Sequence, residues 1–199
     1  LYLGEDDVKE LIDMAESIKL MEQLFTRMGP GVTQNAPRTR VRGEGIMLHT
    51  MSAADDFLGY VGWKAYITTE KGAQFPVAVY DRESGRMVAL IEADYLGQMR
   101  TGAVSGLATE SMARPEAAVV GVFGTGLQAR TQLKAVCTVR NIQRVEVYSR
   151  REENRKLFAE EMSQWCDTEV IPVHAPDEAA AEKDIVICAT TSRVPVFEG

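Results

Sequence analysis

Residues Gly124 to Ala129 read Gly-Thr-Gly-Leu-Gln-Ala, which is the G-x-G-x-x-A spacing of a dinucleotide-binding loop. Gly124 permits a tight turn out of the apolar run that precedes it, and Gly126 has no Cβ, so the backbone can approach a pyrophosphate. Ala129 is small enough for the following helix to pack closely on a sheet. The free N–H groups at the start of that helix are predicted to face the phosphates.

The end of the next predicted strand, Arg144–Tyr148, indicates which dinucleotide is preferred. NAD-selective sites usually carry Asp or Glu about 20 residues beyond the glycines, where it binds the ribose 2′-hydroxyl. This sequence has Ser149, Arg150 and Arg151 there, with no carboxylate before Glu152. Two guanidinium groups can bind a 2′-phosphate, and a hydroxyl can add a hydrogen bond. We therefore expect NADP(H) rather than NAD(H), the alternative being that both arginines begin a helix and face water.

Lys64 is the residue of the first half that is best suited to proton transfer. It lies in the otherwise apolar run Val61–Ile67, and lysine is rarely buried unless it is paired or functional. A desolvated lysine has a lowered pKa and can act as a general acid or base. The alternative is a lysine on the wet face of an edge strand.

Arginines in the first half are candidates for binding a carboxylate. Arg38, Arg40 and Arg42 share one strand face by period two, and one of them could hold a carboxylate bidentately, although a solvated basic stripe accounts for at least two of the three. Arg100 is expected near a helix N-terminus among small residues, where it could form part of an anion site. The alternative is an ordinary charged residue at the start of a helix.

These residues need strands and helices to hold them. Residues 1–28 are predicted to be helical and residues 93–113 to form a helix rich in small residues. Between them we expect strands with a hairpin turn at residues 81–86. The expected strands are 38–42, Met47–Thr50, Tyr60–Thr68, Phe75–Tyr80 and Met87–Ile91.

A second part of the chain begins at Pro115, because proline discourages helix in the residue before it. Residues 115–199 have the order strand, glycine loop, helix, strand, followed by two further helices and two further strands, the last over Asp184–Thr190. This order predicts an α/β fold with a Rossmann-type, doubly wound parallel sheet, preceded by an α+β domain over residues 1–114. A full doubly wound domain has about six strands, so the four found here predict an incomplete one.

Composition restricts the partners. The chain has 199 residues, of which 45% are hydrophobic and 26% charged, and its net charge of −7 gives no bulk attraction to nucleic acid or to an anionic membrane. No run approaches the ~20 apolar residues that span a bilayer. The cysteines Cys137, Cys166 and Cys188 do not have the spacing of metal ligands, so no metal is expected. Their odd number predicts reduced thiols and a cytoplasmic location. Cys188 is expected to be buried in its strand.

The residues taken together resemble the ornithine cyclodeaminase/mu-crystallin family over essentially the whole chain. The similarity is in the order and spacing of short motifs rather than in any one of them. These motifs are Leu1-Tyr2-Leu3, Pro37-Arg38-Thr39, Gly62-Trp63-Lys64, Tyr80-Asp81 with Ser84-Gly85, Met99-Arg100-Thr101-Gly102-Ala103, Ala113-Arg114-Pro115, Gly124-Thr125-Gly126-Leu127-Gln128-Ala129 and Ala189-Thr190-Thr191-Ser192.

The resemblance implies a role for each matching residue. Lys64 matches the family's active-site lysine, and Arg38 and Arg100 match the two arginines that hold the substrate carboxylate. The implied cofactor contacts are Thr101, Gly124, Thr125, Gly126, Leu127, Gln128, Ser149, Arg150, Arg151 and Thr190. The resemblance further implies NAD(P)-dependent hydride transfer at the Cα–N bond of a small amino or imino acid, in a homodimer built through a substrate-binding N-terminal domain.

The resemblance leaves the reaction open. The family includes ketimine reductases, amino-acid dehydrogenases, ornithine cyclodeaminases that make proline and ammonia, and NADPH-dependent proteins that only bind a small ligand. The cyclodeaminase subgroup has a catalytic aspartate later in the nucleotide-binding domain, in a region that these 199 residues do not include, so they neither confirm nor deny it. The segment from Lys64 to Phe75 is shorter than in typical ornithine cyclodeaminases, which counts against ornithine as the substrate.

Overall fold

The computed structural model describes residues 1–69 and 72–198, and its contacts divide the chain into two compact units. The N-terminal unit comprises Leu1–Asp13 and Lys19–Gly97, and the C-terminal unit comprises Met14–Ile18 and Gln98–Gly199. Two helices, α2 and α3, contribute residues to both units. The domain boundary expected between residues 114 and 115 stays a prediction.

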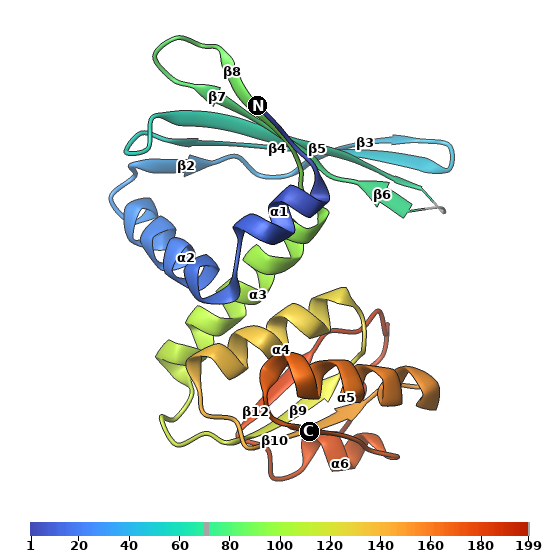
Figure 1. Cartoon of the computed structure of the whole chain (residues 1–199). Coiled ribbons are helices and arrows are strands. Elements are labelled where there is room, and N and C mark those ends of the chain that lie inside the picture. The colour runs from blue at the N-terminus through green and yellow to red at the C-terminus, as the bar shows by residue number, and fades with distance from the viewer. Residues whose placement is uncertain (70–71, 199) are drawn as a thin grey trace. The chain divides into compact units, whose positions relative to one another are not determined.

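The N-terminal unit is built on a mixed sheet of eight strands within the described residues (Figure 1). Its strand order is β1-β8-β7-β5-β4-β2, with β3 on β4 and β6 on β5; β1 and β8 run parallel and the other pairs antiparallel. The strands are β1 (Tyr2–Leu3), β2 (Thr33–Asn35), β3 (Thr39–Gly43), β4 (Ile46–Asp55), β5 (Tyr60–Thr69), β6 (Gly72–Gln74), β7 (Pro76–Asp81) and β8 (Met87–Glu92).

The first 28 residues are not one helical segment. They form β1, then α1 (Glu5–Leu11) and α2 (Met14–Met28), and the break falls at Ile12, whose φ of −122° and ψ of 134° are extended. Helical periodicity could not show β1, because that strand exists only through its pairing of Tyr2 with Leu90 across the chain. The expected strands and the turn before Met87 are confirmed, and β2 and β6 were not predicted.

The C-terminal unit has a parallel sheet of four described strands with helices on both faces (Figure 1). The strand order β11-β10-β9-β12 is the 3-2-1-4 part of the doubly wound order. The elements are α3 (Asp94–Met112), β9 (Val119–Phe123), α4 (Leu127–Val139), β10 (Arg144–Tyr148), α5 (Glu152–Cys166), β11 (Glu169–Pro172), α6 (Pro176–Ala180) and β12 (Ile185–Cys188).

Strand β9 is buried on both faces, as expected for the centre of a parallel sheet. Val120 and Val122 face a core under α4 and α5 that includes Leu133 and Phe158, all fully buried. On the other face α6 lies so close that a Cβ on Gly121 would be 1.8 Å from the carbonyl oxygen of Ala179. Glycine is therefore required where α6 crosses the sheet. Cys188 corrects one prediction, because it ends β12 and is exposed.

Candidate functional site

Lys64 lies in the centre of β5, opposite Met51 of β4 and Val77 of β7. Its ammonium is 4.7 Å from the centre of the Phe75 ring and 5.5 Å from that of Tyr66, both of which are cation–π distances. Alternation places it on the opposite face of the strand from Trp63. The edge-strand alternative is thus excluded, since β5 is paired on both sides.

Tyr66 brings a second predicted residue to the same place. The guanidinium carbon of Arg38 is 5.9 Å from the Tyr66 ring centre, on the strand face that carries Lys64. Both cations therefore share one aromatic residue of the N-terminal unit. A cationic pair around an aromatic ring can bind a small carboxylate and keep one side of it dry.

His49 belongs to this cluster and was not predicted from the sequence. Its ring stacks on that of Tyr66 with 4.4 Å between centroids and 4° between planes, and its Nε2 is 3.1 Å from Thr68 Oγ1. Burial lowers the pKa of His49, and the positive charges of Arg40 and Arg38 lower it further, so the imidazole is neutral at pH 7. Only strand pairing could have revealed it, because His49 faces Tyr66 across β4 and β5.

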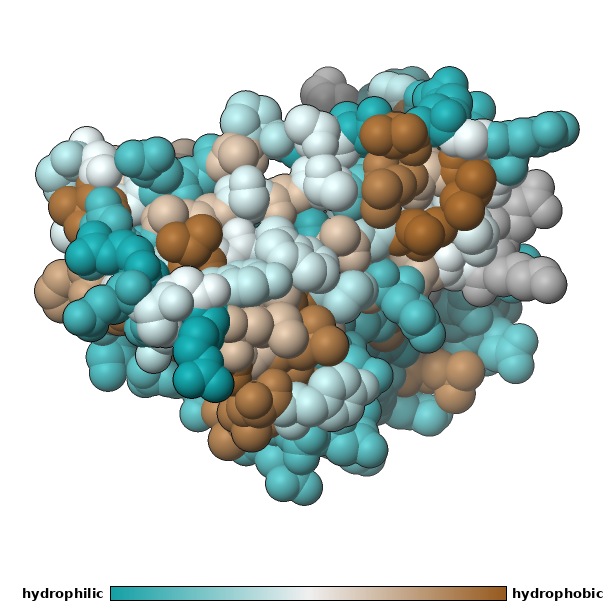
Figure 2. All heavy atoms as spheres, turned by 90° about the horizontal axis from the view of Figure 1, so that it is seen from above, coloured by the Kyte–Doolittle hydropathy of each residue, from teal (hydrophilic) through white to brown (hydrophobic). Residues whose placement is uncertain are grey.

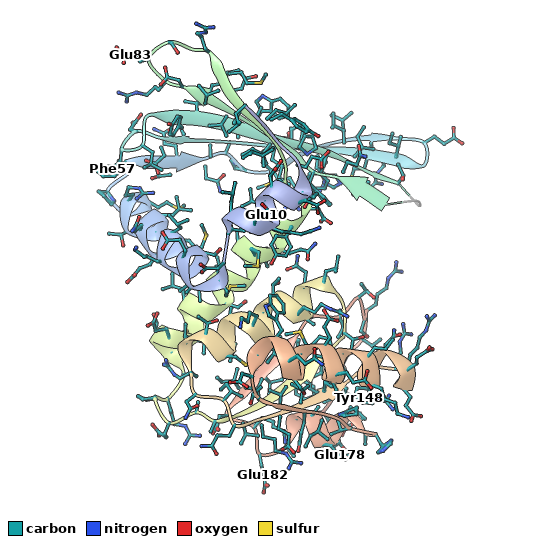
Figure 3. All side chains as sticks on the ribbon, viewed as in Figure 1. Glu10, Phe57, Glu83, Tyr148, Glu178 and Glu182 are labelled. Atoms are coloured by element: carbon teal, nitrogen blue, oxygen red, sulfur yellow. The ribbon has the colours of Figure 1, made fainter. Side chains whose placement is uncertain are left out.

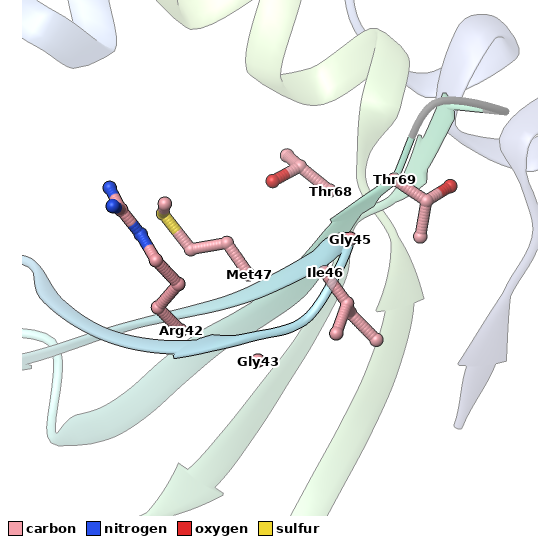
Figure 4. A pocket seen from close by; sticks show the side chains of 7 residues that line it. All are labelled: Arg42, Gly43, Gly45, Ile46, Met47, Thr68 and Thr69. Atoms are coloured by element: carbon pink, nitrogen blue, oxygen red, sulfur yellow. The ribbon is translucent and has the colours of Figure 1, made fainter.

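Arg40 and Arg42 extend the same face toward the β3–β4 hairpin, Arg40 opposite His49 and Arg42 opposite Met47. A pocket of about 410 Å³ lies at this end, lined by Arg42, Gly43, Gly45, Ile46, Met47, Thr68 and Thr69. Figure 4 shows the side chains of Arg42, Met47 and Thr68 on one side of the hairpin. Thr68 thus connects this pocket to the ring of His49.

Arg100 corrects a prediction about its position. Helix α3 begins at Asp94, so Arg100 lies in the second turn rather than at the N-terminus, and its side chain is exposed. The helix-terminus argument for an anion site therefore does not apply. Arg100 and its neighbour Thr101 belong to the C-terminal unit, whereas Arg38 and Lys64 belong to the N-terminal unit.

The glycine loop has the backbone geometry of a dinucleotide-binding loop. Gly124 has φ of +105°, and a Cβ there would lie 2.2 Å from the carbonyl oxygen of Ala189. A Cβ on Gly126 would meet no atom within 4 Å, so the space above it is open. Helix α4 begins at Leu127 with Gly126 as its N-cap, and its first turn presents N–H groups that no helical carbonyl can satisfy.

The loop is exposed where a ligand would need access, at Gly126, Leu127 and Gln128, and buried at Ala129, which is 0% exposed. Thr190 lies beside it, because its methyl group is 3.3 Å from the Cβ position of Gly124. These residues fit a bound pyrophosphate, with the open side of Gly126 as the decisive observation.

Ser149, Arg150 and Arg151 follow β10 next to this loop. Thr125 Oγ1 is 3.5 Å from Ser149 Oγ, and the side chains of both arginines are exposed, with no hydrogen bond or ion pair in the described part of the chain. Arg155, which is 7% exposed, donates from Nη1 to the main-chain oxygen of Ser149.

The guanidinium carbon of Arg155 is also 5.5 Å from the centre of the Tyr148 ring. Tyr148 is labelled in Figure 3. A buried arginine thus holds the turn that carries the exposed arginines. No periodic pattern distinguished Arg155 from Arg150 and Arg151 before the structure was known.

Two kinds of site have no support in the structure. Among residues 1–69 and 72–198, no three His, Cys, Asp or Glu side chains are grouped in a way that could hold a metal ion. Within the same residues, every helix is too short or too polar to cross a membrane.

A parallel sheet with a glycine loop of this geometry, joined in one chain to a mixed sheet that carries a lysine–arginine cluster, defines a dinucleotide-binding class of α/β protein. The chain belongs to the ornithine cyclodeaminase/mu-crystallin family, whose model matches residues 2–199. This confirms the resemblance drawn from the sequence motifs.

Individual relatives agree with the family. Δ1-pyrroline-2-carboxylate reductase of Bacillus cereus is 37% identical over 121 residues, which are 61% of this chain and 37% of that protein. Alanine dehydrogenase of Archaeoglobus fulgidus is 31% identical over 207 aligned positions, covering all of this chain and 62% of that protein. The chain thus spans less than two thirds of the length of these relatives.

A solved structure shows the same fold. Δ1-pyrroline-2-carboxylate reductase of Thermococcus litoralis, in complex with NADH and L-proline, has a TM-score of 0.93 and 34% identity to this chain, covering 99% of it and 64% of the reductase.

Proposed function

We propose that the protein catalyses NAD(P)-dependent hydride transfer at the Cα–N bond of a small amino or cyclic imino acid. The observation that carries this proposal is the placement of Lys64 and Arg38 about Tyr66 on one face of the sheet. A protein that only binds a ligand does not need an ammonium beside a carboxylate-binding arginine. The relatives named above, a Δ1-pyrroline-2-carboxylate reductase and an alanine dehydrogenase, act on this type of bond.

Each proposed site residue has a role. Arg38 and Arg100 bind the substrate carboxylate, which fixes Cα for reaction. Lys64 holds or delivers the proton of the substrate nitrogen, and Phe75 and Tyr66 exclude water from its ammonium. The nicotinamide supplies or removes the hydride. His49 supports the Tyr66 ring by stacking on it. Because its pKa is lowered, the imidazole adds no positive charge beside Arg38 and Arg40.

The cofactor is proposed to be NADP(H) in preference to NAD(H). Its pyrophosphate is held by Gly124, Thr125, Gly126, Leu127 and Gln128, with Thr101 and Thr190 as further contacts. Its 2′-phosphate is held by Ser149, Arg150 and Arg151. The proposal is supported by the exposure of both guanidinium groups beside the loop and by the absence of a carboxylate between Tyr148 and Glu152 in the sequence.

We also propose that residues 1–114 bind the substrate and form a homodimer, and that residues 115–199 bind the cofactor. The sheet face opposite Lys64 carries exposed apolar side chains: Val41 is 67% exposed and Ile67 is 44% exposed. By strand register Leu48, Val61 and Trp63 lie on the same face. Figure 2 shows several separate groups of hydrophobic side chains among hydrophilic ones in the view from above. A second copy is the partner that would cover such a face.

Nicotinamide absorbance of the full-length protein tests the function. NADPH or NADH is added with a five- or six-membered cyclic 2-imino acid, and NAD⁺ or NADP⁺ with ornithine in a parallel reaction. The expected result is consumption of NADPH with the cyclic imine. Proline and ammonia from ornithine without net change in the cofactor would instead establish a cyclodeaminase. Tight NADPH binding without turnover of any amino or imino acid would overturn the proposal in favour of a binding protein.

A further inference from the structure

Arg130, in the first turn of α4, holds two consecutive carbonyl groups of the glycine loop. Its side-chain Nη1 donates to the main-chain oxygen of Thr125 at 2.5 Å, and its main-chain N–H donates to the oxygen of Gly126 at 3.3 Å. In a trans peptide group the N–H points away from the C=O. The N–H groups of Gly126 and Leu127, which belong to the same two peptide groups, are therefore turned away from the atoms that hold the carbonyls.

These two N–H groups are oriented but not used within the chain. Neither the N–H of Gly126 nor that of Leu127 donates a hydrogen bond to any residue that the structure describes. The loop is open at Gly126, where a Cβ would meet no atom within 4 Å. A pyrophosphate is anionic and accepts hydrogen bonds from main-chain N–H groups at this place in a Rossmann-type loop. Arg130 thus fixes the carbonyl side of the peptide groups whose N–H side is available to the phosphates.

The guanidinium of Arg130 is itself held in place by α5. Its Nε is 2.9 Å from both carboxylate oxygens of Glu161, and its Nη2 is 2.7 Å from Oε2 of the same carboxylate. Its central carbon is 5.4 Å from the centre of the Phe158 ring, which is fully buried. Glu161 balances the charge of Arg130 and occupies two of its three nitrogen atoms. The arginine is therefore suited to fixing the geometry of the loop rather than to supplying a positive charge.

We propose that Arg130 is a positioning residue for the dinucleotide. Held by Glu161, it fixes the carbonyl of Thr125 and so directs the N–H groups of the loop at the pyrophosphate. This inference rests on the proposed function of the loop as a cofactor site, and it adds a pair of residues that act through the main chain of the loop.

Direct binding of a phosphate by Arg130 is the alternative, and the two roles differ in what removal of the Glu161 carboxylate does. If Arg130 touches a phosphate, loss of the carboxylate releases the guanidinium and strengthens dinucleotide binding. If Arg130 acts through the carbonyl of Thr125, loss of the carboxylate loosens the guanidinium and weakens dinucleotide binding. The sign of the effect therefore separates the two roles.

The experiment titrates the full-length protein with NADPH, NADH and ADP-ribose in a calorimeter. ADP-ribose carries the pyrophosphate but no nicotinamide. Arg130→Met should weaken the binding of all three ligands by about tenfold, because the lost contact acts on the part that they share. Glu161→Gln should weaken all three by about threefold. Tighter binding in Glu161→Gln, or full recovery of affinity in Arg130→Lys, would overturn the proposal, since either result shows that charge alone is sufficient.

Lys134 provides the matched control, because it links the same two helices one turn further along α4. Its Nζ donates to the main-chain oxygen of Trp165 at 2.6 Å. Lys134→Met should lower the thermal unfolding midpoint but keep all three affinities within about twofold of the original. Equal losses of affinity in Lys134→Met and Arg130→Met would overturn the proposal, because helix packing would then account for both.

The failure of this inference differs from the failure of the proposed function. If the unsubstituted protein binds none of the three ligands, the cofactor proposal is refuted and this inference with it. If the unsubstituted protein binds them and Arg130→Met binds them equally well, this inference alone is refuted. Glu161→Gln, which leaves the arginine in place, provides the test if Arg130→Met does not fold.

Discussion

The ammonium of Lys64 lies against Gly97 in the first turn of α3, where a Cβ on the glycine would be only 3.3 Å from Nζ. This distance is shorter than an ordinary van der Waals contact, so an alanine at position 97 would displace the lysine head. A helix residue without a side chain thus sets the position of the amine in a strand, and the two residues are expected to act as one functional unit.

Replacement of Lys64 by methionine keeps the length of the side chain and removes the charge. If Lys64 handles the substrate proton, kcat falls by about 100-fold or more, whereas the dissociation constant of NADPH changes little. Steady-state kinetics and NADPH titration measure the two quantities. Gly97→Ala should give a smaller loss of the same kind. Loss of NADPH affinity together with turnover in Lys64→Met would show that the lysine is structural.

Two glycines of the loop should respond differently to alanine. Gly126→Ala fills open space, so the thermal unfolding midpoint stays close to that of the original protein, but the affinity for the dinucleotide falls by tenfold or more because the new methyl group occupies its place. Gly124→Ala is strained at φ of +105° and collides with Ala189, so it lowers stability itself. Thermal unfolding with and without NADPH distinguishes the two. A Gly126→Ala protein that binds NADPH normally would contradict the assignment of the loop.

The cofactor preference depends on the residues after β10. Ser149→Asp places a carboxylate where a 2′-phosphate is proposed to bind, and Arg150→Ala removes one of its cations. The double variant should lose at least about tenfold in affinity for NADPH, equivalent to about 1.4 kcal/mol, and keep or gain affinity for NADH. Parallel titrations with both cofactors provide the measurement. An unchanged ratio of the two affinities would refute the proposed role of these residues.

Arg140 should be a strong contributor to stability. Its guanidinium donates to the main-chain oxygens of Thr109, Glu110 and Ala113 at the end of α3, and also to those of Arg114 and Val139. Arg140→Met leaves the helix end without these donors and should cost about 2–4 kcal/mol. Chemical denaturation measures the change. Arg86→Met, at an exposed position of a hairpin, is the control and should change the free energy of unfolding by less than about 0.5 kcal/mol.

The dimer proposal predicts a change of mass in solution. Ile67→Glu puts a charge into the middle of the apolar face opposite Lys64, and two copies would bring two such charges together. Light scattering after size exclusion should find a dimer for the original protein and a monomer for the variant. Glu153→Lys, on an exposed turn of α5, should remain a dimer. A monomeric original protein would refute the proposal directly.

Local patterns predicted the elements whose signal lies within a few residues. The loop from Gly124 to Ala129, the strand Arg144–Tyr148 and the alternation around Lys64 are of this type, and the structure confirms these elements. Three features depend on contacts between distant residues and were missed for that reason. They are the strand β1, which pairs with β8, the histidine at position 49, which faces Tyr66 across two strands, and the capping arginine at position 140.

Arg100 shows a second limit of local patterns. The sequence predicted a helix over residues 93–113 and placed Arg100 near its N-terminus among small residues. The helix is confirmed, but Arg100 lies in its second turn. One of the small residues, Gly102, allows close approach of another helix, because its Cβ position is 2.5 Å from the carbonyl oxygen of Thr131 in α4. The sequence of a single helix does not show which neighbour its small residues pack against.

Strand β5 presents Lys64 to one side of the sheet and Trp63 to the other, with nine residues of β5 held in antiparallel register by β4. An insertion or deletion of one residue in this strand would exchange the two faces for the residues that follow it. Side chains on the Lys64 face would move to the Trp63 face, and the reverse. Changes of an even number of residues preserve the sides. Homologous sequences should therefore differ in this strand by substitution and almost never by a gap of one residue. The alternation of side chains between the two faces is then preserved along the whole strand.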